Sequence, residues 1–88
     1  MAHKVYTKEE FLKIVAMAIM STSDGDKTGV FLIEEYLKKE SIVFSKQELR
    51  TVMDSLITSK IISYEDENIR YDTIKLPYVV VMGKIPGD

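Results

Sequence analysis

The sequence predicts an α+β fold in which three helices are followed by a β-hairpin. Apolar residues recur at helical spacing over the first two thirds of the chain, and two of these stretches begin with a capping box. After residue 60 the pattern changes to β-branched and aromatic residues in rough alternation. A length of 88 residues, of which 45% are hydrophobic, matches one globular domain. We therefore expect a single domain over residues 1–88, with residues 1–6 and 83–88 as frayed ends.

The first helix is expected to begin after Thr7, because Thr7 and Glu10 have the spacing of a capping box. An apolar stripe at helical spacing follows it, made of Phe11, Leu12, Val15, Ala18 and Ile19. Ile14, Met17 and Met20 widen this stripe until the helix is apolar on most sides. Such a helix needs cover from more than one direction. A polar loop over residues 21–27 ends it.

Two more helices are expected over residues 30–40 and 45–58, joined by a short connector whose apolar residues fill the core. The third helix has the strongest signal, since Ser45 and Glu48 form a second capping box. Its buried side repeats at i, i+3, i+4 and i+7, with Leu49, Val52, Met53 and Leu56.

The segments 61–64 and 69–76 have the composition of strands, and the polar residues 65–68 between them predict a turn. We therefore expect these two segments to pair as a hairpin. Pro77 interrupts the pattern, and residues 78–82 form one extra apolar C-terminal strand.

Composition excludes several classes of function. The chain has no cysteine and one histidine, which excludes disulfides, thiolate metal sites and a multi-histidine site. No residue pattern suits a nucleophile with its base or a phosphate-binding loop, so we expect neither an enzyme nor a cofactor. The longest apolar run near the start, residues 14–20, is far shorter than the roughly 20 residues that span a bilayer. With Glu9 and Glu10 in place of a basic leader, we expect a cytoplasmic protein without membrane association.

The order of these elements resembles a winged helix-turn-helix domain over roughly residues 7–76. The resemblance rests on residues 31–37 as the supporting helix, residues 45–58 as the recognition-type helix and residues 61–76 as the wing. Lys60 departs from the family, whose members usually carry glycine there. The resemblance implies a DNA-binding protein, and most simply a transcriptional regulator, whose third helix enters the major groove.

The side of the third helix opposite its apolar stripe carries the candidate DNA contacts. Gln47, Arg50 and Thr51 are expected to reach bases, since Gln pairs with adenine and Arg with guanine. Phosphate contacts are expected from Ser45, Lys46 and Lys60.

Charge argues against DNA at two places. Asp54 lies in the middle of the same helix face, and the expected wing tip is acidic at residues 65–67, in a chain whose net charge is -2. An acidic wing tip repels phosphate, which dominates protein–DNA affinity. The alternative is a protein–protein interaction module of the same fold that uses the acidic hairpin and does not bind DNA.

A second candidate site is a calcium loop. Asp24, Asp26, Thr28 and Glu35 occupy positions one, three, five and twelve of an EF-hand spacing, with Gly29 at position six. Thr28 and Leu32 depart from the usual polar pattern, and the chain offers no second such loop. The alternative is a polar turn in which Gly25 or Gly29 takes a positive φ and Asp26 or Thr28 caps the second helix.

Apolar surface exceeds what a minimal domain of this kind buries. Either the C-terminal strand packs beside the first helix, or the two meet a second copy of the chain. We expect a homodimer, in which Ile14, Met17 and residues 79–81 contact their symmetry mates.

Overall fold

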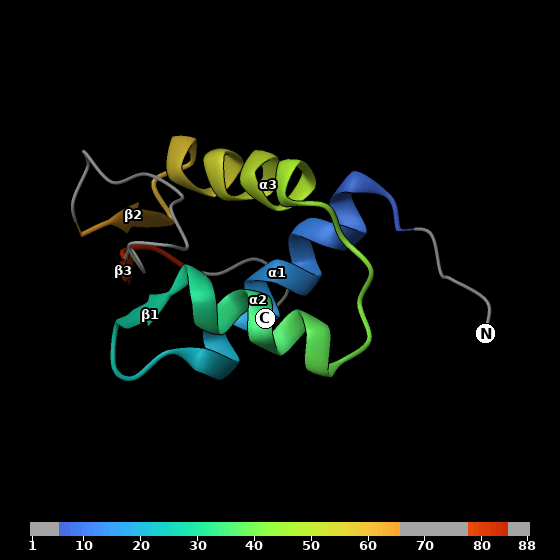
Figure 1. Ribbon diagram of the computed structural model, residues 1–88. Coiled ribbons are helices and arrows are strands. Elements are labelled where there is room, and N and C mark those ends of the chain that lie inside the picture. The colour runs from blue at the N-terminus through green and yellow to red at the C-terminus, as the bar shows by residue number, and fades with distance from the viewer. Residues whose placement is uncertain (1–5, 66–77, 85–88) are drawn as a thin grey trace.

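The computed structural model describes residues 6–65 and 78–84, and it shows an α+β fold with helices and an antiparallel sheet (Figure 1). This confirms the predicted class. The elements follow in the order α1 (Lys8–Thr22), β1 (Lys27–Gly29), α2 (Val30–Lys39), α3 (Lys46–Thr58), β2 (Ile62–Tyr64) and β3 (Tyr78–Val81). None of the helices in these described ranges is long and apolar enough to cross a membrane.

Both predicted capping boxes are present. At the start of α1, the Glu10 N–H donates to Thr7 Oγ1 at 3.1 Å and the Thr7 N–H donates to Glu10 Oε1 at 3.0 Å. Ser45 and Glu48 make the same pair of bonds at the start of α3, each 3.0 Å long. Each box satisfies the third N–H of its helix and the N–H of its N-cap residue with nearby side chains, which explains why these helix starts were predictable.

Two helices end in the same way, on a residue in the left-handed region that is not glycine. After α2, Ser41 has φ 59°, and after α3, Lys60 has φ 61°. The Lys60 N–H donates to the Ile57 carbonyl at 2.9 Å, and the Ile61 N–H donates to the Leu56 carbonyl at 3.0 Å. These are the two bonds of a Schellman motif, which normally has glycine at the left-handed position. Lys60 therefore stands where the backbone favours glycine.

The sheet contains strand pairings that we did not predict. Its order is β1-β3-β2, with both pairs antiparallel, so the segment we expected as an extra C-terminal strand is the middle strand. Val79 pairs with Thr28 on one side and with Tyr64 on the other. Strand β2 pairs with Tyr78–Val81. The partner that we expected for it in the hairpin, residues 69–76, lies outside the described residues.

Strand β1 was not predicted at all. We expected residues 21–27 to be a polar loop leading to the second helix, but Lys27–Gly29 pair with β3. The chain turns at Gly25, which has φ 70°, and Asp24 and Lys27 form an isolated bridge on either side of it. Gly29 is the N-cap of α2, and neither Asp26 nor Thr28 caps that helix with a side chain.

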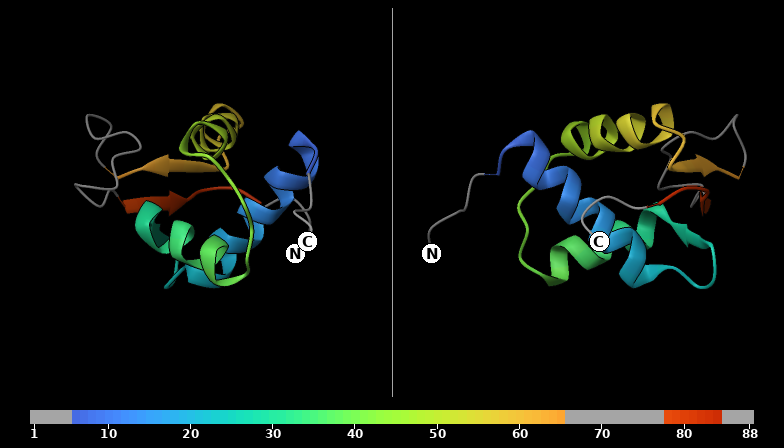
Figure 2. Two further views of the ribbon diagram at one scale, coloured as in Figure 1. Left: turned by 45° about the vertical axis from the view of Figure 1, so that its right-hand side comes forward. Right: turned by 180° about the vertical axis from the view of Figure 1, so that it is seen from behind.

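Helix α1 lies at the centre of the helical part and packs against both α2 and α3. Figure 2 shows the sheet at the end of the molecule where α2 starts and α3 ends. The hydrophobic core draws on the three helices, β2 and β3, and its largest fully buried side chains are Val15, Ile19, Val30, Ile33, Leu37, Leu49, Met53, Leu56, Ile62 and Val79. The described parts of the two expected frayed ends make contacts: Tyr6 packs on the core, and the Gly83 N–H donates to the Ile61 carbonyl.

Candidate nucleic-acid interface

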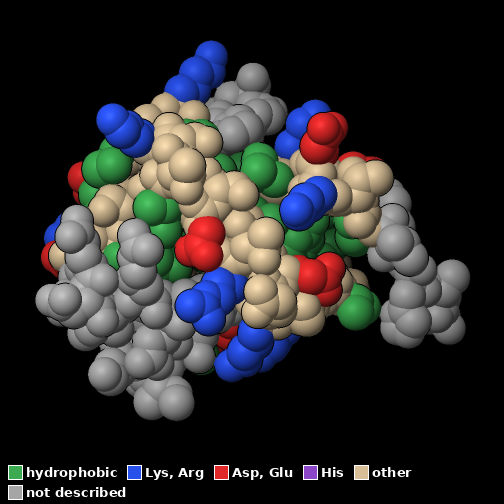
Figure 3. Space-filling view, turned by 90° about the horizontal axis from the view of Figure 1, so that it is seen from above, with side chains coloured by type: hydrophobic (Ala, Val, Ile, Leu, Met, Phe, Trp, Pro, Cys, Tyr) green, Lys and Arg blue, Asp and Glu red, His purple; other side chains and the backbone are tan. Residues whose placement is uncertain are grey.

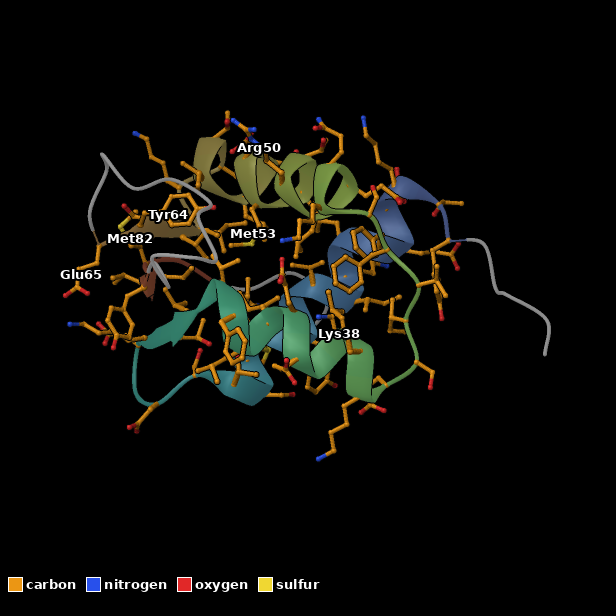
Figure 4. The ribbon with its side chains drawn as sticks, viewed as in Figure 1. Lys38, Arg50, Met53, Tyr64, Glu65 and Met82 are labelled. Carbon is orange, nitrogen blue, oxygen red and sulfur yellow. The ribbon has the colours of Figure 1, made fainter. Side chains whose placement is uncertain are left out.

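Helix α3 divides into a buried side and an outward side, as its apolar period predicts. Leu49, Val52, Met53 and Leu56 are all buried. In Figure 4, Met53 points from α3 into the body of the molecule while Arg50 points away from it. The packing of the apolar side therefore fixes the direction in which the candidate contacts face.

The three residues expected to contact bases lie close together in the first two turns of α3. Gln47 and Arg50 are exposed, and neither side chain makes a hydrogen bond or an ion pair with a described residue. Thr51 is half-buried, and its hydroxyl donates to the Gln47 carbonyl at 2.9 Å. As far as the described residues go, the side-chain polar groups of Gln47 and Arg50 are thus available to a ligand.

The residues expected to contact phosphates lie at the two ends of the same helix. Ser45 is its N-cap, and the hydroxyl oxygen accepts the Glu48 N–H while the hydroxyl proton can still be donated. Lys46 is exposed in the first turn, and Lys60 is exposed just beyond the C-cap. The structure therefore groups Ser45 and Lys46 with the base contacts and separates Lys60 from them by the length of α3.

Short side chains cover the second half of the outward side of α3. The Ser55 hydroxyl donates to the Thr51 carbonyl at 3.1 Å, and the Thr58 hydroxyl donates to the Asp54 carbonyl at 2.9 Å. Folded back in this way, the hydroxyls leave a shallow hollow of about 440 Å³, lined by Thr51, Asp54, Ser55, Thr58 and Ser59. The sequence does not reveal this hollow, because it depends on the rotamers that the hydroxyls adopt.

Charges of both signs are interspersed on this face, which Figure 3 shows from above. Lys46, Arg50 and Lys60 stand against Glu48 and Asp54, a surplus of one positive charge. The first acid of the expected wing tip forms an ion pair, because Glu65 Oε1 lies 3.0 Å from Nζ of Lys27. The hydrogen bond to Glu65 and its negative charge raise the pKa of Lys27. Asp66 and Glu67 lie outside the described residues.

A small cavity of about 190 Å³ lies between the start of α1 and the first turns of α3. Phe11 and Val52, both nearly buried, belong to its lining, and Gln47 and Thr51 are on its α3 side. The cavity places two of the candidate base contacts beside α1. Sequence reasoning missed it, since helical periodicity does not say where two helices diverge.

The calcium-loop residues do not form a metal site in this structure. Within the described ranges there is no group of three or more His, Cys, Asp and Glu side chains that could hold an ion. Thr28, expected as a ligand, is buried in β1, and its hydroxyl lies 2.6 Å from that of Thr22. Asp24 lies in the bridge before β1, whereas Glu35 lies on the exposed side of α2.

No protein-family model, curated protein or solved structure matches this chain. Its function therefore has to be argued from the geometry of α3 and its surroundings.

Proposed function

We propose that this chain is a winged-helix protein that binds duplex DNA, with α3 in the major groove, and that it regulates transcription. The observation that carries the proposal is the outward side of α3, where Gln47 and Arg50 are exposed and uncommitted on a helix whose other side is anchored in the core. The order of the three helices and the direct passage of α3 into β2 support the resemblance.

The chemistry of these two side chains suits base edges. The Gln47 amide both donates and accepts, which matches the N6 and N7 groups of adenine, and the Arg50 guanidinium matches O6 and N7 of guanine. Phosphates on either side of a groove could be contacted from the two ends of α3. Ser45 and Lys46 lie at its start, and Lys60 lies just beyond its end.

Protein docking through the acidic hairpin is the alternative. The ion pair between Glu65 and Lys27 weighs against it, because the one described acid of this hairpin is already bonded within the chain. The same pair also holds that charge beside the sheet, where it opposes phosphate less than a free carboxylate would.

Fluorescence anisotropy with a labelled mixed-sequence duplex at low salt, repeated over a salt series, tests the proposal. We expect binding that weakens steeply with salt, and a further loss for Arg50→Ala. Lys13→Ala is the matched control, since it removes one exposed positive charge from α1 instead of α3. No binding at tens of micromolar protein, or equal losses for both variants, would favour the docking alternative.

We also propose that the protein acts as a homodimer through α1. Met17 and Met20 are 56% and 45% exposed, and Ile14 on the same side of the helix is half-buried. Val79 belongs to the core of its own chain, so of the C-terminal strand only the half-buried Val80 and Val81 can take part. A symmetric dimer suits DNA, because two recognition helices can address successive major grooves.

A further inference from the structure

Asp54 is an unexpected residue on a DNA-binding face, since a carboxylate repels the phosphates on both sides of a groove. It is exposed, and its side chain makes no hydrogen bond or ion pair with a described residue. No described lysine or arginine therefore forms an ion pair with it. An acid that served only as a solvated surface residue would weaken DNA binding at this position without making a compensating contact.

The surroundings of Asp54 allow a base edge to come close. It belongs to the shallow hollow on the second half of α3, whose other lining side chains are Thr51, Ser55, Thr58 and Ser59. Thr51, Ser55 and Thr58 each donate their hydroxyl proton to a carbonyl of their own helix. The carboxylate is consequently the strongest polar group in the hollow, and a short side chain such as Asp reaches a base only where the helix surface is low.

Only two groups in the major groove can donate to a carboxylate, namely N4 of cytosine and N6 of adenine. Adenine carries the acceptor N7 beside its amino group, and this lone pair repels a carboxylate, whereas cytosine has no acceptor beside N4 on its groove edge. Thymine and guanine present acceptors only. Asp54 can therefore be satisfied in the groove chiefly by cytosine.

Arg50 lies one helical turn before Asp54 and is equally exposed. Residues four apart are separated by about 6 Å along a helix axis, while successive bases of one strand are about 3.4 Å apart. The two side chains thus address base pairs within about two steps of each other, and Arg50 favours guanine.

We propose that Asp54 is a specificity-determining residue, which selects duplexes with a cytosine where its carboxylate meets the major groove, close to a guanine read by Arg50. This inference rests on the proposed function. Phosphate repulsion by Asp54 weakens all complexes alike, and only a complex in which the carboxylate accepts a hydrogen bond from an amino group offsets it.

The test is selection of binding sites from a pool of randomised duplexes with the wild-type chain and Asp54→Asn. Anisotropy with single-base variants of the enriched site then gives the preference at each position. We expect a cytosine preference in the wild type that falls about tenfold in Asp54→Asn, with other positions unchanged. Binding of Asp54→Asn to a random duplex should be equal or tighter. Asp24→Asn, which removes an exposed acid far from α3 in sequence, should leave the preferences unaltered.

The outcomes separate this inference from the proposed function. If the wild-type chain binds no duplex, the proposed function fails and this inference fails with it. If the wild type binds but Asp54→Asn selects the same base at every position, or if the wild type enriches no cytosine, only the role of Asp54 is overturned. Circular dichroism of Asp54→Asn should match the wild type, because the Thr58 hydroxyl bonds to the backbone carbonyl of residue 54 and not to its side chain.

Discussion

Lys27 and Glu65 lie 3.0 Å apart, from Nζ to Oε1, and their ion pair connects β1 to the end of β2 across the middle strand β3. Both side chains are about half exposed, at 51% and 46%. Exposed pairs of this kind add little to stability and are screened by salt. The importance of this pair is positional, because it keeps a carboxylate of the expected wing beside the sheet.

The ion pair predicts a loss of stability at alkaline pH. The hydrogen bond to Glu65 and its charge raise the pKa of Lys27 above the ordinary value of 10.5. Because the pKa of Lys27 is raised in the folded state, the ion pair contributes fully to stability below the ordinary pKa. This contribution disappears as the pH rises through the pKa of the folded state. In melting curves from pH 7 to 12, the wild type should exceed Lys27→Gln by a small margin that vanishes above pH 10.5. A margin that persists at pH 12 would contradict the prediction, and Lys13→Gln, at another exposed lysine, controls for net charge.

The hydroxyls of Thr22 and Thr28 form a contact between the end of α1 and β1, and their oxygens are 2.6 Å apart. Thr28 is only 2% exposed, so removal of Thr22 Oγ1 takes away its hydroxyl partner in a nearly dry environment. We expect Thr22→Val to lower the free energy of unfolding by about 1–2 kcal/mol. The double variant with Thr28→Val should lose less than the sum of the two single changes, which urea denaturation can measure. Strict additivity would show that the contact contributes nothing.

Lys60 predicts a stabilising substitution. Its φ of 61° lies in the left-handed region, which disfavours a residue that carries Cβ. Lys60→Gly should therefore raise the free energy of unfolding by about 0.5–1 kcal/mol in urea denaturation. Lys60→Ala removes the same charge but keeps Cβ, and it should give no such gain. A gain of equal size in both variants would assign the effect to charge and refute the backbone explanation.

Exposed methionines on α1 predict the oligomeric state. Sedimentation equilibrium at tens of micromolar should give a mass of roughly twice 10.1 kDa for the wild type. Met17→Glu places a charge in the proposed interface and should return a monomer. Val43→Glu is the matched control, because Val43 is 62% exposed and lies outside α1, and it should remain dimeric. A wild type that sediments at 10.1 kDa would exclude the dimer.

The helices were predictable because their signals are local. The capping box fixes where α3 starts. Four apolar residues at helical spacing fix its buried side, and therefore the exposure of Gln47 and Arg50 on the other side. Strand pairing depends on partners far apart in the sequence. Lys27–Gly29 has three residues, a polar composition and a glycine, and it becomes a strand because Tyr78–Val80 lies beside it. Alternation alone cannot choose between Tyr78–Val81 and a nearer segment as the partner of β2.

The details of the candidate interface were predictable only in part. The period of α3 places Asp54 near Arg50, and the residue types suggest the bases they would meet. The low surface around Asp54 and the cavity beside Gln47 were not predictable. Both depend on side-chain rotamers and on the way α1 diverges from α3, which a linear pattern does not contain.

Among the described strands the middle one comes last in sequence, so β1 and β2 gain the partner that they share only when residue 81 has been synthesised. During translation the three helices can pack together first. Lys27–Gly29 and Ile62–Tyr64 can pair with Tyr78–Val81 only after that segment has left the ribosome and inserted between them. A nonsense codon at position 78 therefore removes both described strand pairings at once rather than shortening the sheet by one edge.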